Sequence, residues 1–514
     1  MLVKTYGSAV FGVNATTITI EVNVDQGINF YLVGLPDTAV KESQKRIYTA
    51  MKNCGYRIPG KKIVINMAPA DVKKEGSAYD TPIAIGILAA SEMINKDKIS
   101  DYIIMGELSL DGSLQPIKGV LPIAIEAKKA GFKGFILPAM NAKEASIVSD
   151  FDVYGVENIK QIVDFLNNDI ALIPTITNPR EEFSKNQYSF EHDFADVKGQ
   201  ENIKRALEIA AAGGHNIIMI GPPGSGKTML AKRLPSILPP LTLSEALETT
   251  KIHSVAGKLL RNSSLVSLRP FRYPHHTISD IALVGGGTFP QPGEISLAHN
   301  GVLFLDELPE FKRTVLEVLR QPLEERIVTI SRARFSVEYP ASFMMVASMN
   351  PCPCGFYNHP EKQCLCPPGS IQRYLNKISG PLLDRIDIQI EVTPVSFNDL
   401  TIKNRVGETS QVIRERVIKA RQIQSERYKN NKHIYCNAQI TTSLMDKYCN
   451  LDQSCIDLLR VATERLKLSA RAYDRILKVA RTIADIEQTE NIASHHIAEA
   501  INYRNLDREN WGNK

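Results

Sequence analysis

The chain of 514 residues is too long for a single hydrophobic core, so we expect two to four domains. Its 43% hydrophobic and 23% charged residues are typical of a soluble globular protein, and its net charge of +5 favours a polyanionic partner only weakly. Eight cysteines do not make a disulfide scaffold in a chain of this size. No apolar leader opens the sequence, and the most apolar helical segment, residues 82–94, is too short to span a bilayer. We therefore expect a cytoplasmic protein without a membrane partner.

The sequence pattern divides the chain into four parts. Residues 1–170 alternate short β-rich runs with amphipathic helical stretches, which predicts an α+β domain. Residues 171–192 contain prolines and charges without apolar periodicity and are interpreted as a linker. Residues 193–395 contain continuous apolar runs, typical of parallel strands buried on both faces, at 216–220, 301–305 and 343–347. Residues 396–514 hold helical patterns, which indicates an all-helical domain.

A phosphate-binding loop follows the first of these apolar runs. Its glycines let backbone N–H groups surround phosphate oxygens, and the helix expected at 229–234 adds the dipole of its N-terminus. Lys227 would neutralise the β- and γ-phosphates, and the Thr228 hydroxyl would bind Mg²⁺. The flanking strand and helix disfavour the alternative, a chance glycine-rich turn. The motif consists of Gly221, Pro222, Pro223, Gly224, Ser225, Gly226, Lys227 and Thr228, and it predicts a site for ATP with Mg²⁺.

Polar residues end the other two apolar runs. Asp306 and Glu307 would lie at the carboxyl edge of the sheet, where ligands bind. Asp306 would hold Mg²⁺, and Glu307 would polarise the attacking water, which is the step that separates hydrolysis from binding. Asn350 ends the third run, and its amide could orient that water. The alternatives are a solvated acidic turn for the two acids and a strand-capping role for Asn350.

Together with residues 194–200, these motifs resemble an AAA+ ATPase. More narrowly, five blocks resemble the ComM/YifB branch of the magnesium-chelatase-like ATPases, a family of branch-migration helicases. These blocks are residues 269–279, 285–287, 292–299, 350–355 and 379–387. The resemblance runs nearly end to end and implies a multi-domain α/β protein. It would combine an N-domain of Lon-protease/ribosomal-S5-like α+β fold, an AAA+ αβα core with the P-loop, and a helical C-terminal lid.

The resemblance assigns two arginines to the site. Arg385 would be a finger that reaches the ATP of a neighbouring subunit, so the active site would form only in an oligomer. Arg471, at the start of an expected helix, would be the lid arginine that senses the γ-phosphate. Arg475 lies on the same helix face four residues later and is the rival candidate. A surface ion pair is the alternative for each.

Residues 327–339 contain two β-rich runs around Arg332 and Arg334, which predicts a hairpin with a basic tip. In related AAA+ helicases a hairpin at this point projects into the central channel, so the resemblance implies that both arginines bind DNA phosphates. An ordinary surface hairpin with solvated arginines is the alternative. His275 and His276 lie in a second insertion, for which the sequence indicates no ligand.

Four of the cysteines lie close together in a loop rich in proline and glycine. Four thiolates on one loop can close tetrahedrally on Zn²⁺. The C-x-C spacing is tighter than the usual C-x-x-C, His359 could replace one ligand, and free or redox-active thiols are the alternative. The candidate ligands are Cys352, Cys354, Cys364 and Cys366.

Residues 74–80 and 106–121 resemble a Lon-type protease domain, with Ala78 at the nucleophile position and Leu121 at the position of the catalytic lysine. Without a hydroxyl and a general base, Ser–Lys chemistry cannot proceed. Ser77 lies one residue away, and the sequence does not settle whether it neighbours Lys118. We therefore interpret the domain as non-proteolytic, with a binding or assembly role.

These expectations combine into a motor that moves along DNA. By the resemblance, it would form a ring, expected to be a homo-hexamer, that acts on single-stranded or branched DNA. It would promote branch migration in recombination, notably during natural transformation. The first alternative is a chelatase-type motor that remodels a protein partner, although such motors should lack the N-terminal domain. An ATP-dependent protease is the second alternative, which the missing dyad disfavours.

Overall fold

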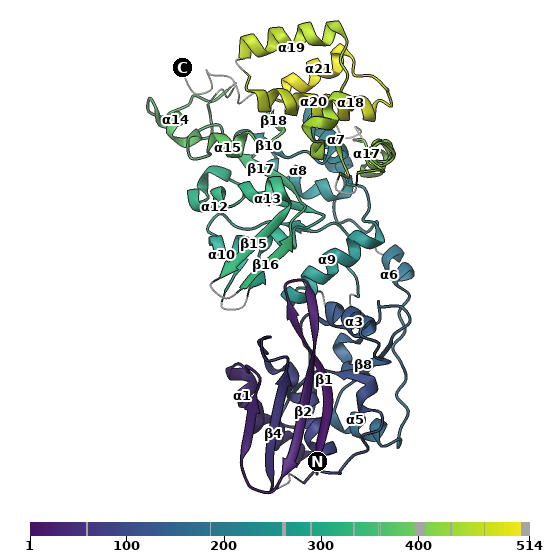
Figure 1. Ribbon diagram of the computed structural model, residues 1–514. Helices are drawn as coiled ribbons and strands as arrows, with labels where there is room; N and C mark the ends of the chain where they lie inside the picture. The colour runs from purple at the N-terminus through teal and green to yellow at the C-terminus, as the bar shows by residue number, and fades with distance from the viewer. Residues whose placement is uncertain are drawn as a thin grey trace.

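The computed structural model describes residues 1–57, 60–185, 187–259, 264–287, 290–332, 335–357, 359, 361–395, 407–431, 434–466 and 468–504. The molecule is elongated, with an N-terminal domain and a C-terminal helical domain at opposite ends of a central domain (Figure 1). Within those ranges, no helix combines the length and the apolar character that crossing a membrane requires.

The N-terminal domain combines two small sheets with helices. The first sheet, in the order β1-β2-β4-β3, contains β1 (Leu2–Phe11), β2 (Asn14–Asp25), β4 (Lys62–Ala68) and β3 (Phe30–Val33). The second is parallel and contains β5 (Tyr102–Ile104), β8 (Gly134–Pro138) and β9 (Asp152–Val156). A separate ribbon pairs β6 (Glu107–Leu108) with β7 (Leu114–Gln115). The helices are α1 (Thr38–Asn53), α2 (Asp80–Ala90), α3 (Val120–Lys129), α4 (Ala142–Ala145) and α5 (Ile159–Leu166).

Side-chain alternation explains how this domain packs. In β2, Ile18, Ile20 and Val22 are fully buried while the residues between them are partly exposed, so one face of the sheet covers the core. Helix α2 is buried along its whole length because it carries no charge after Asp80. Asp80 itself is paired with Arg46 of α1 at 2.7 Å. The apolar α2 is thus the centre of this domain.

The central domain is built around a five-stranded parallel sheet in the order β11-β14-β17-β10-β18. The strands are β11 (Phe271–Arg272), β14 (Val302–Leu305), β17 (Met344–Met349), β10 (Ile217–Ile220) and β18 (Ile388–Glu391). Every residue of β10, β14 and β17 is buried, as expected for strands covered by helices on both faces. The predicted parallel-sheet core is therefore confirmed. This order brings the carboxyl ends of β10, β14 and β17 together.

Helices and two ribbons complete this domain. The helices are α7 (Glu201–Gly213), α8 (Lys227–Arg233), α9 (Leu243–Ala256), α10 (Asp280–Val284), α11 (Glu294–Leu297), α12 (Arg313–Glu317), α13 (Arg320–Glu325), α14 (Ser370–Leu375) and α15 (Gly380–Leu383). The ribbons pair β12 (Gly285–Gly286) with β13 (Gln291–Pro292) and β15 (Ile327–Arg332) with β16 (Phe335–Pro340). The expected linker contains one short helix, α6 (Pro179–Lys185).

The C-terminal domain is helical throughout its described part. Its helices are α17 (Ser410–Arg427), α18 (Thr442–Tyr448), α19 (Gln453–Leu466), α20 (Ala470–Ile486) and α21 (Ser494–Asn502). Single 3₁₀ turns occur along the chain at Ser77–Tyr79, Ile99–Asp101, Ala139–Asn141, Phe194–Asp196, Leu234–Ser236, Leu308–Glu310 and Asn437–Gln439.

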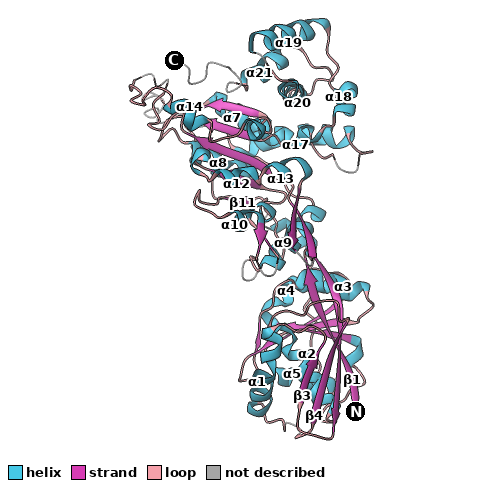
Figure 2. Ribbon diagram, turned by 60° about the vertical axis from the view of Figure 1, so that its left-hand side comes forward, coloured by secondary structure: helices cyan, strands magenta, loops and turns pink. Residues whose placement is uncertain are grey.

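The N-terminal and central domains share a buried contact between α3 and α9, which lie side by side in both views (Figures 1 and 2). The Gly119 N–H donates to the Ser254 carbonyl at 3.1 Å. The buried Glu144 carboxylate accepts hydrogen bonds from the Leu121 N–H at 3.0 Å and from the Ser254 hydroxyl at 2.5 Å. The apolar cluster here consists of Leu121, Ile147, Leu241, Ala246 and Leu265.

The long β1–β2 pair makes a second contact, since it reaches from the N-terminal domain toward the central one in Figure 2. At its tip, Gly12 lies against Val337 of β16, with only 3.0 Å from the position of an added Cβ to a Val337 methyl group. The N-terminal domain is thus packed against the ribbon on which the basic tip was predicted.

A buried polar network joins the central sheet to the C-terminal domain. The His215 imidazole contacts the Asp387 carboxylate at 3.0 Å through Nδ1 and the Thr482 hydroxyl of α20 at 2.8 Å through Nε2. Burial lowers the pKa of His215, although Asp387 opposes this shift. For Asp387, burial raises the pKa, but Arg475 and His215 outweigh burial and hold it well below its ordinary value. Burial therefore favours the neutral form of His215 in the folded protein.

This network predicts a pH dependence of stability. The folded pKa of His215 lies below the unfolded value of about 6.5, so the unfolded chain binds more protons and stability falls as the pH drops below about 6.5. His215→Gln should lose about 1–3 kcal/mol at pH 7.5 but show a smaller fall in melting temperature between pH 7.5 and 5.5. Thermal unfolding of both proteins at both pH values checks this. Equal slopes would show that His215 does not contribute to the acid sensitivity.

Candidate nucleotide-binding site

The loop between β10 and α8 has a backbone that requires its glycines. An added Cβ at Gly221 would lie 2.3 Å from the carbonyl oxygen of Val392, the residue after β18, so the backbone there approaches too closely for any side chain. Gly226, just before α8, has φ +90°, in the left-handed region that favours glycine. Ser225, between them, has a buried hydroxyl without a hydrogen-bond partner in the described part of the chain. The loop therefore forms a cradle around the N-terminus of α8, with a polar group available to a ligand.

Lys227 connects this loop to a second strand. Its ammonium group donates to the carbonyls of Gly221 at 2.7 Å and Pro222 at 2.9 Å, and to the Asn350 amide oxygen at 3.3 Å. Burial lowers the pKa of Lys227, while Asp306 and Glu307 oppose the shift. Two of the predicted residues, Lys227 and Asn350, thus meet at the carboxyl edge of the sheet.

Asp306 lies at the centre of a set of hydroxyl groups. Its Oδ2 accepts hydrogen bonds from Thr228 at 2.7 Å and from the Tyr273 phenol at 2.9 Å, and its Oδ1 accepts one from Ser348. Burial raises the pKa of Asp306, but these three donors outweigh burial and leave it below its ordinary value. The carboxylate is therefore ionised, as a cation ligand must be. Tyr273 and Ser348 reach Asp306 because β11 and β17 are both neighbours of β14, and the sequence pattern assigns neither residue a role.

Glu307 has an unusual backbone and an imidazole neighbour. Its φ of +54° lies in the left-handed region, which turns its side chain away from the line of β14. The side chain is 54% exposed, and its Oε2 lies 3.6 Å from Nδ1 of His276. Sequence reasoning left His276 without a role, because no spacing rule connects the second insertion to the end of β14.

The arrangement fits a nucleoside triphosphate with a divalent cation. Backbone N–H groups at the start of α8 and the Lys227 ammonium group suit phosphate oxygens. The Thr228 hydroxyl and the ionised Asp306 carboxylate, 2.7 Å apart, form an all-oxygen donor set of the kind that Mg²⁺ prefers. All eight residues of the predicted phosphate-binding motif, from Gly221 to Thr228, belong to this cradle.

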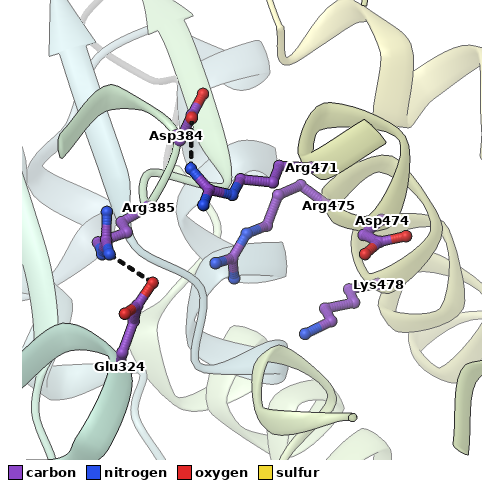
Figure 3. Close-up of a pocket in the computed structure, with 7 residues that line it drawn as sticks. All are labelled: Glu324, Asp384, Arg385, Arg471, Asp474, Arg475 and Lys478. Carbon is purple, nitrogen blue, oxygen red and sulfur yellow. Dashed lines mark hydrogen bonds and ion pairs between the residues drawn. The ribbon is translucent and has the colours of Figure 1, made fainter. Parts of the chain in front are cut away.

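The predicted arginines lie in a different place, in a pocket between the central domain and α20 (Figure 3). Arg385 is paired with Glu324 at 2.5 Å and Arg471 with Asp384 at 3.2 Å. Among the described residues, neither arginine has a recorded bond to the phosphate-binding loop. The pocket is lined by Glu324, Asp384, Arg385, Arg471, Asp474, Arg475 and Lys478.

The structure distinguishes the two candidate lid arginines. Arg475 is 23% exposed and is paired with the buried Asp387 at 2.9 Å, so it belongs to the core network. Arg471 is 66% exposed and is paired with Asp384 at 3.2 Å. Replacing the carboxylate partner by a ligand therefore requires less free energy at Arg471 than at Arg475.

The four clustered cysteines converge, with one ligand atom from each within 4.8 Å of the others. The sulfur of Cys352 lies 3.4 Å from that of Cys354 and 3.8 Å from that of Cys364. The sulfurs of Cys354 and Cys364 are 3.6 Å apart. Nδ1 of His359 accepts hydrogen bonds from the N–H groups of Glu361 and Lys362, so this nitrogen is already used. The four thiols, without His359, form the candidate metal site.

Two other predicted features have different outcomes. In the hairpin, Arg332 ends β15 opposite Phe335, and Arg334 lies outside the described residues.

In the N-terminal domain, the Ser77 hydroxyl is hydrogen-bonded to the Glu107 carboxylate. The Lys118 side chain packs against Gly257 of the central domain, 2.8 Å from the position of an added Cβ. Ser77 is thus bonded to a carboxylate, whereas the Lys118 side chain lies in the interface between the N-terminal and central domains.

Comparison with known proteins covers most of the chain. Residues 193–400 match the family described as magnesium chelatase, subunit ChlI. Residues 20–141 match subunit ChlI of Mg-chelatase, and residues 407–504 match the ChlI C-terminal family.

Full-length relatives give the more specific assignment. Competence protein ComM of Haemophilus influenzae is 46% identical over 506 residues, covering 98% of this chain and 97% of the relative. Uncharacterized protein YifB of Salmonella typhimurium is 44% identical over 505 residues, or 97% and 96% of the two chains. The magnesium-chelatase 38 kDa subunit of Rhodobacter capsulatus is 25% identical over 177 residues, only 31% of this chain and 50% of the relative. The chain therefore belongs to the ComM/YifB-type family of magnesium-chelatase-like AAA+ proteins.

Proposed function

We propose that this protein hydrolyses ATP and uses the energy to move along DNA as a ring-shaped motor. The observation that carries the ATPase part is the convergence of Lys227, Asn350, Thr228 and Asp306 at one edge of the parallel sheet. The likeness to competence protein ComM over 98% of the chain supports DNA as the partner. The ring is proposed to be a homo-hexamer that promotes branch migration in recombination during natural transformation.

In this proposal, each residue of the cradle has one task. Lys227 exchanges its carbonyl partners for phosphate oxygens, and Asn350, already within 3.3 Å of Lys227, orients the attacking water. Thr228 and Asp306 would hold Mg²⁺, which would neutralise charge that develops on the phosphates. Glu307, beside Asp306, accepts the proton of the water.

We propose that Arg385 and Arg471 complete the site of a neighbouring subunit. Both line one pocket (Figure 3). Asn216, which precedes β10, donates a hydrogen bond to the Arg385 carbonyl, whereas the phosphate-binding loop follows β10. Arg385 is only 12% exposed and is paired with Glu324, so it must change partners to reach a phosphate. In an isolated subunit these arginines pair with carboxylates, which fits hydrolysis that depends on assembly.

The other assignments complete the proposal. Residues 1–170 are proposed to be a non-proteolytic Lon-like domain, 171–192 a linker, 193–395 the AAA+ core and 396–514 the lid. Arg332 and Arg334 are proposed to bind DNA at the tip of the β15–β16 ribbon, and the four clustered thiols to hold a structural Zn²⁺. A chelatase-type motor acting on a protein is the second candidate, and the family matches at residues 20–141, 193–400 and 407–504 favour it. The magnesium-chelatase 38 kDa subunit of Rhodobacter capsulatus covers only 31% of this chain, however, against 98% for ComM.

Two substitutions test the ATPase site. Lys227→Ala should remove ATP binding, because the buried positive charge is lost, and hydrolysis with it. Glu307→Gln should bind ATP normally but turn it over about 10²- to 10⁴-fold more slowly, the range for loss of a general base. Nucleotide binding and phosphate release, measured separately on each variant, check this. Normal turnover by Lys227→Ala would overturn the proposed site.

Mixed rings test the finger in trans. Arg385→Ala should lower the turnover number about 10³-fold or more while ATP still binds. Mixing Arg385→Ala in equal amounts with Glu307→Gln should restore part of the activity. In a randomly mixed ring, about one quarter of the contacts between subunits combine an intact Glu307 from one subunit with an intact Arg385 from the next. Arg460→Ala, which removes an exposed arginine of α19, is the control and should keep wild-type activity. No recovery on mixing would mean that Arg385 does not act across subunits.

DNA as the partner is tested by its effect on the rate of ATP hydrolysis. Combined Arg332→Ala and Arg334→Ala should abolish stimulation of ATP hydrolysis by branched or single-stranded DNA and flatten the salt dependence of DNA binding. Combined Arg460→Ala and Arg465→Ala removes the same charge from α19 and should leave the stimulation intact. ATPase rates across a salt series check both. If DNA does not stimulate the wild-type protein at all, the chelatase-type alternative gains.

A further inference from the structure

The cysteine loop, which we define as residues 351–369, begins directly after Asn350 and ends at α14. Its tip touches the phosphate-binding loop, because an added Cβ at Gly355 would lie 2.6 Å from Cδ of Pro223. Gly355 has φ +83°, and its N–H donates to the Cys352 carbonyl at 3.0 Å, which closes a tight turn between the first two cysteines. The turn that carries Cys352 and Cys354 thus packs on the nucleotide cradle without room for one methyl group.

Both ends of the loop are attached to Asn350. Cys352 is two residues further along the chain and fully buried. At the other end, Tyr374 of α14 is largely buried, and its phenol accepts a hydrogen bond from the Asn350 backbone. Asn350 in turn accepts a hydrogen bond from Lys227. The position of Asn350 therefore depends on the shape of the cysteine loop.

The sulfur atoms have the spacing and the hydrogen bonds of a tetrathiolate site. Zn–S bonds of about 2.3 Å in a tetrahedron separate neighbouring sulfurs by about 3.8 Å, close to the 3.4–3.8 Å found for Cys352, Cys354 and Cys364. The Tyr357 N–H donates to Cys352 Sγ at 3.3 Å.

The sulfur of Cys354 accepts backbone hydrogen bonds from Phe356 and Leu365. Backbone N–H donors of this kind stabilise thiolates, the form that binds metal.

The loop has little else to hold its shape. Leu365, between the last two cysteines, is 82% exposed, and no helix or strand is described in residues 351–369. A metal that joins distant positions of such a segment stabilises its folded conformation. Joining the four cysteines would therefore hold the contacts to Pro223 and Asn350 in place.

We propose that Zn²⁺ bound by Cys352, Cys354, Cys364 and Cys366 holds the cysteine loop against the phosphate-binding loop, so that zinc occupancy sets the affinity for ATP. This deepens the proposed function, since it rests on the nucleotide site at Lys227. Loss of zinc releases Gly355 from Pro223 and loosens Asn350, while every residue that contacts the phosphates is still present.

Two glycine variants distinguish the effect of the Gly355–Pro223 contact from the backbone strain that any side chain causes at a positive φ. Gly355→Ala should keep its zinc but weaken binding of a fluorescent ATP analogue about tenfold or more, as expected when overpacking displaces a binding loop. Gly369→Ala is the matched control, because Gly369 has a similar φ of +72° but nothing within 4 Å of an added Cβ. It should keep both zinc and affinity. Equal affinities for the two variants would overturn the contact.

Metal removal tests zinc itself. The wild-type protein should contain about one zinc per chain by elemental analysis, and Cys364→Ser should lose it and bind the analogue about tenfold more weakly. If Cys364→Ser does not fold, zinc is stripped from folded wild-type protein by a chelator and then restored, with affinity measured at each stage. A wild-type protein without zinc overturns the site, and unchanged affinity after stripping overturns the coupling. Zinc content is measured without nucleotide and so does not depend on ATP binding. A protein that binds zinc but no ATP would therefore contradict the proposed function and not the zinc site.

Discussion

The site depends on one buried ammonium group. Lys227 has been removed from water at the start of α8, and its partners are two carbonyls of its own loop and the amide of Asn350. Burial of a charge is costly unless anions or dipoles surround it, which is why its pKa is lowered. The phosphates of a nucleotide would supply the charge that this arrangement lacks. Substrate affinity and the order of the surrounding loop therefore have the same electrostatic origin.

The strand order explains why residues far apart in the chain meet here. Because β10 lies beside β17 and β17 beside β14, the three strand ends carry the phosphate-binding loop, Asn350 and Asp306 to one edge. Topology also keeps Arg385 away from this edge, since it precedes β18 and lies near the opposite strand ends. A single subunit thus presents a cradle on one side and an arginine pair on another, which is compatible with the head-to-tail contacts of the proposed ring.

The sequence predicted the contiguous parts of this site better than the dispersed parts. The phosphate-binding loop, Asp306 and Asn350 could be found because each follows an apolar run that can only be a buried strand. Tyr273 could not, because its contact with Asp306 requires knowing that β11 neighbours β14. The choice between Arg471 and Arg475 depends on which of them the buried Asp387 binds, and a four-residue spacing cannot show this.

The β15–β16 ribbon is inserted between β14 and β17, the two strands that carry the proposed catalytic groups, so its root is joined covalently to both. The Ala341 N–H donates to the Arg326 carbonyl at 2.8 Å, which closes that root. The Tyr339 hydroxyl donates to the Pro290 carbonyl at 2.8 Å and so links the ribbon to the second insertion, which also carries His276. His276 in turn contacts Glu307. These contacts, together with the backbone of the second insertion, connect the ribbon to Glu307, the residue proposed to activate water, and packed elements of this kind can couple distant sites.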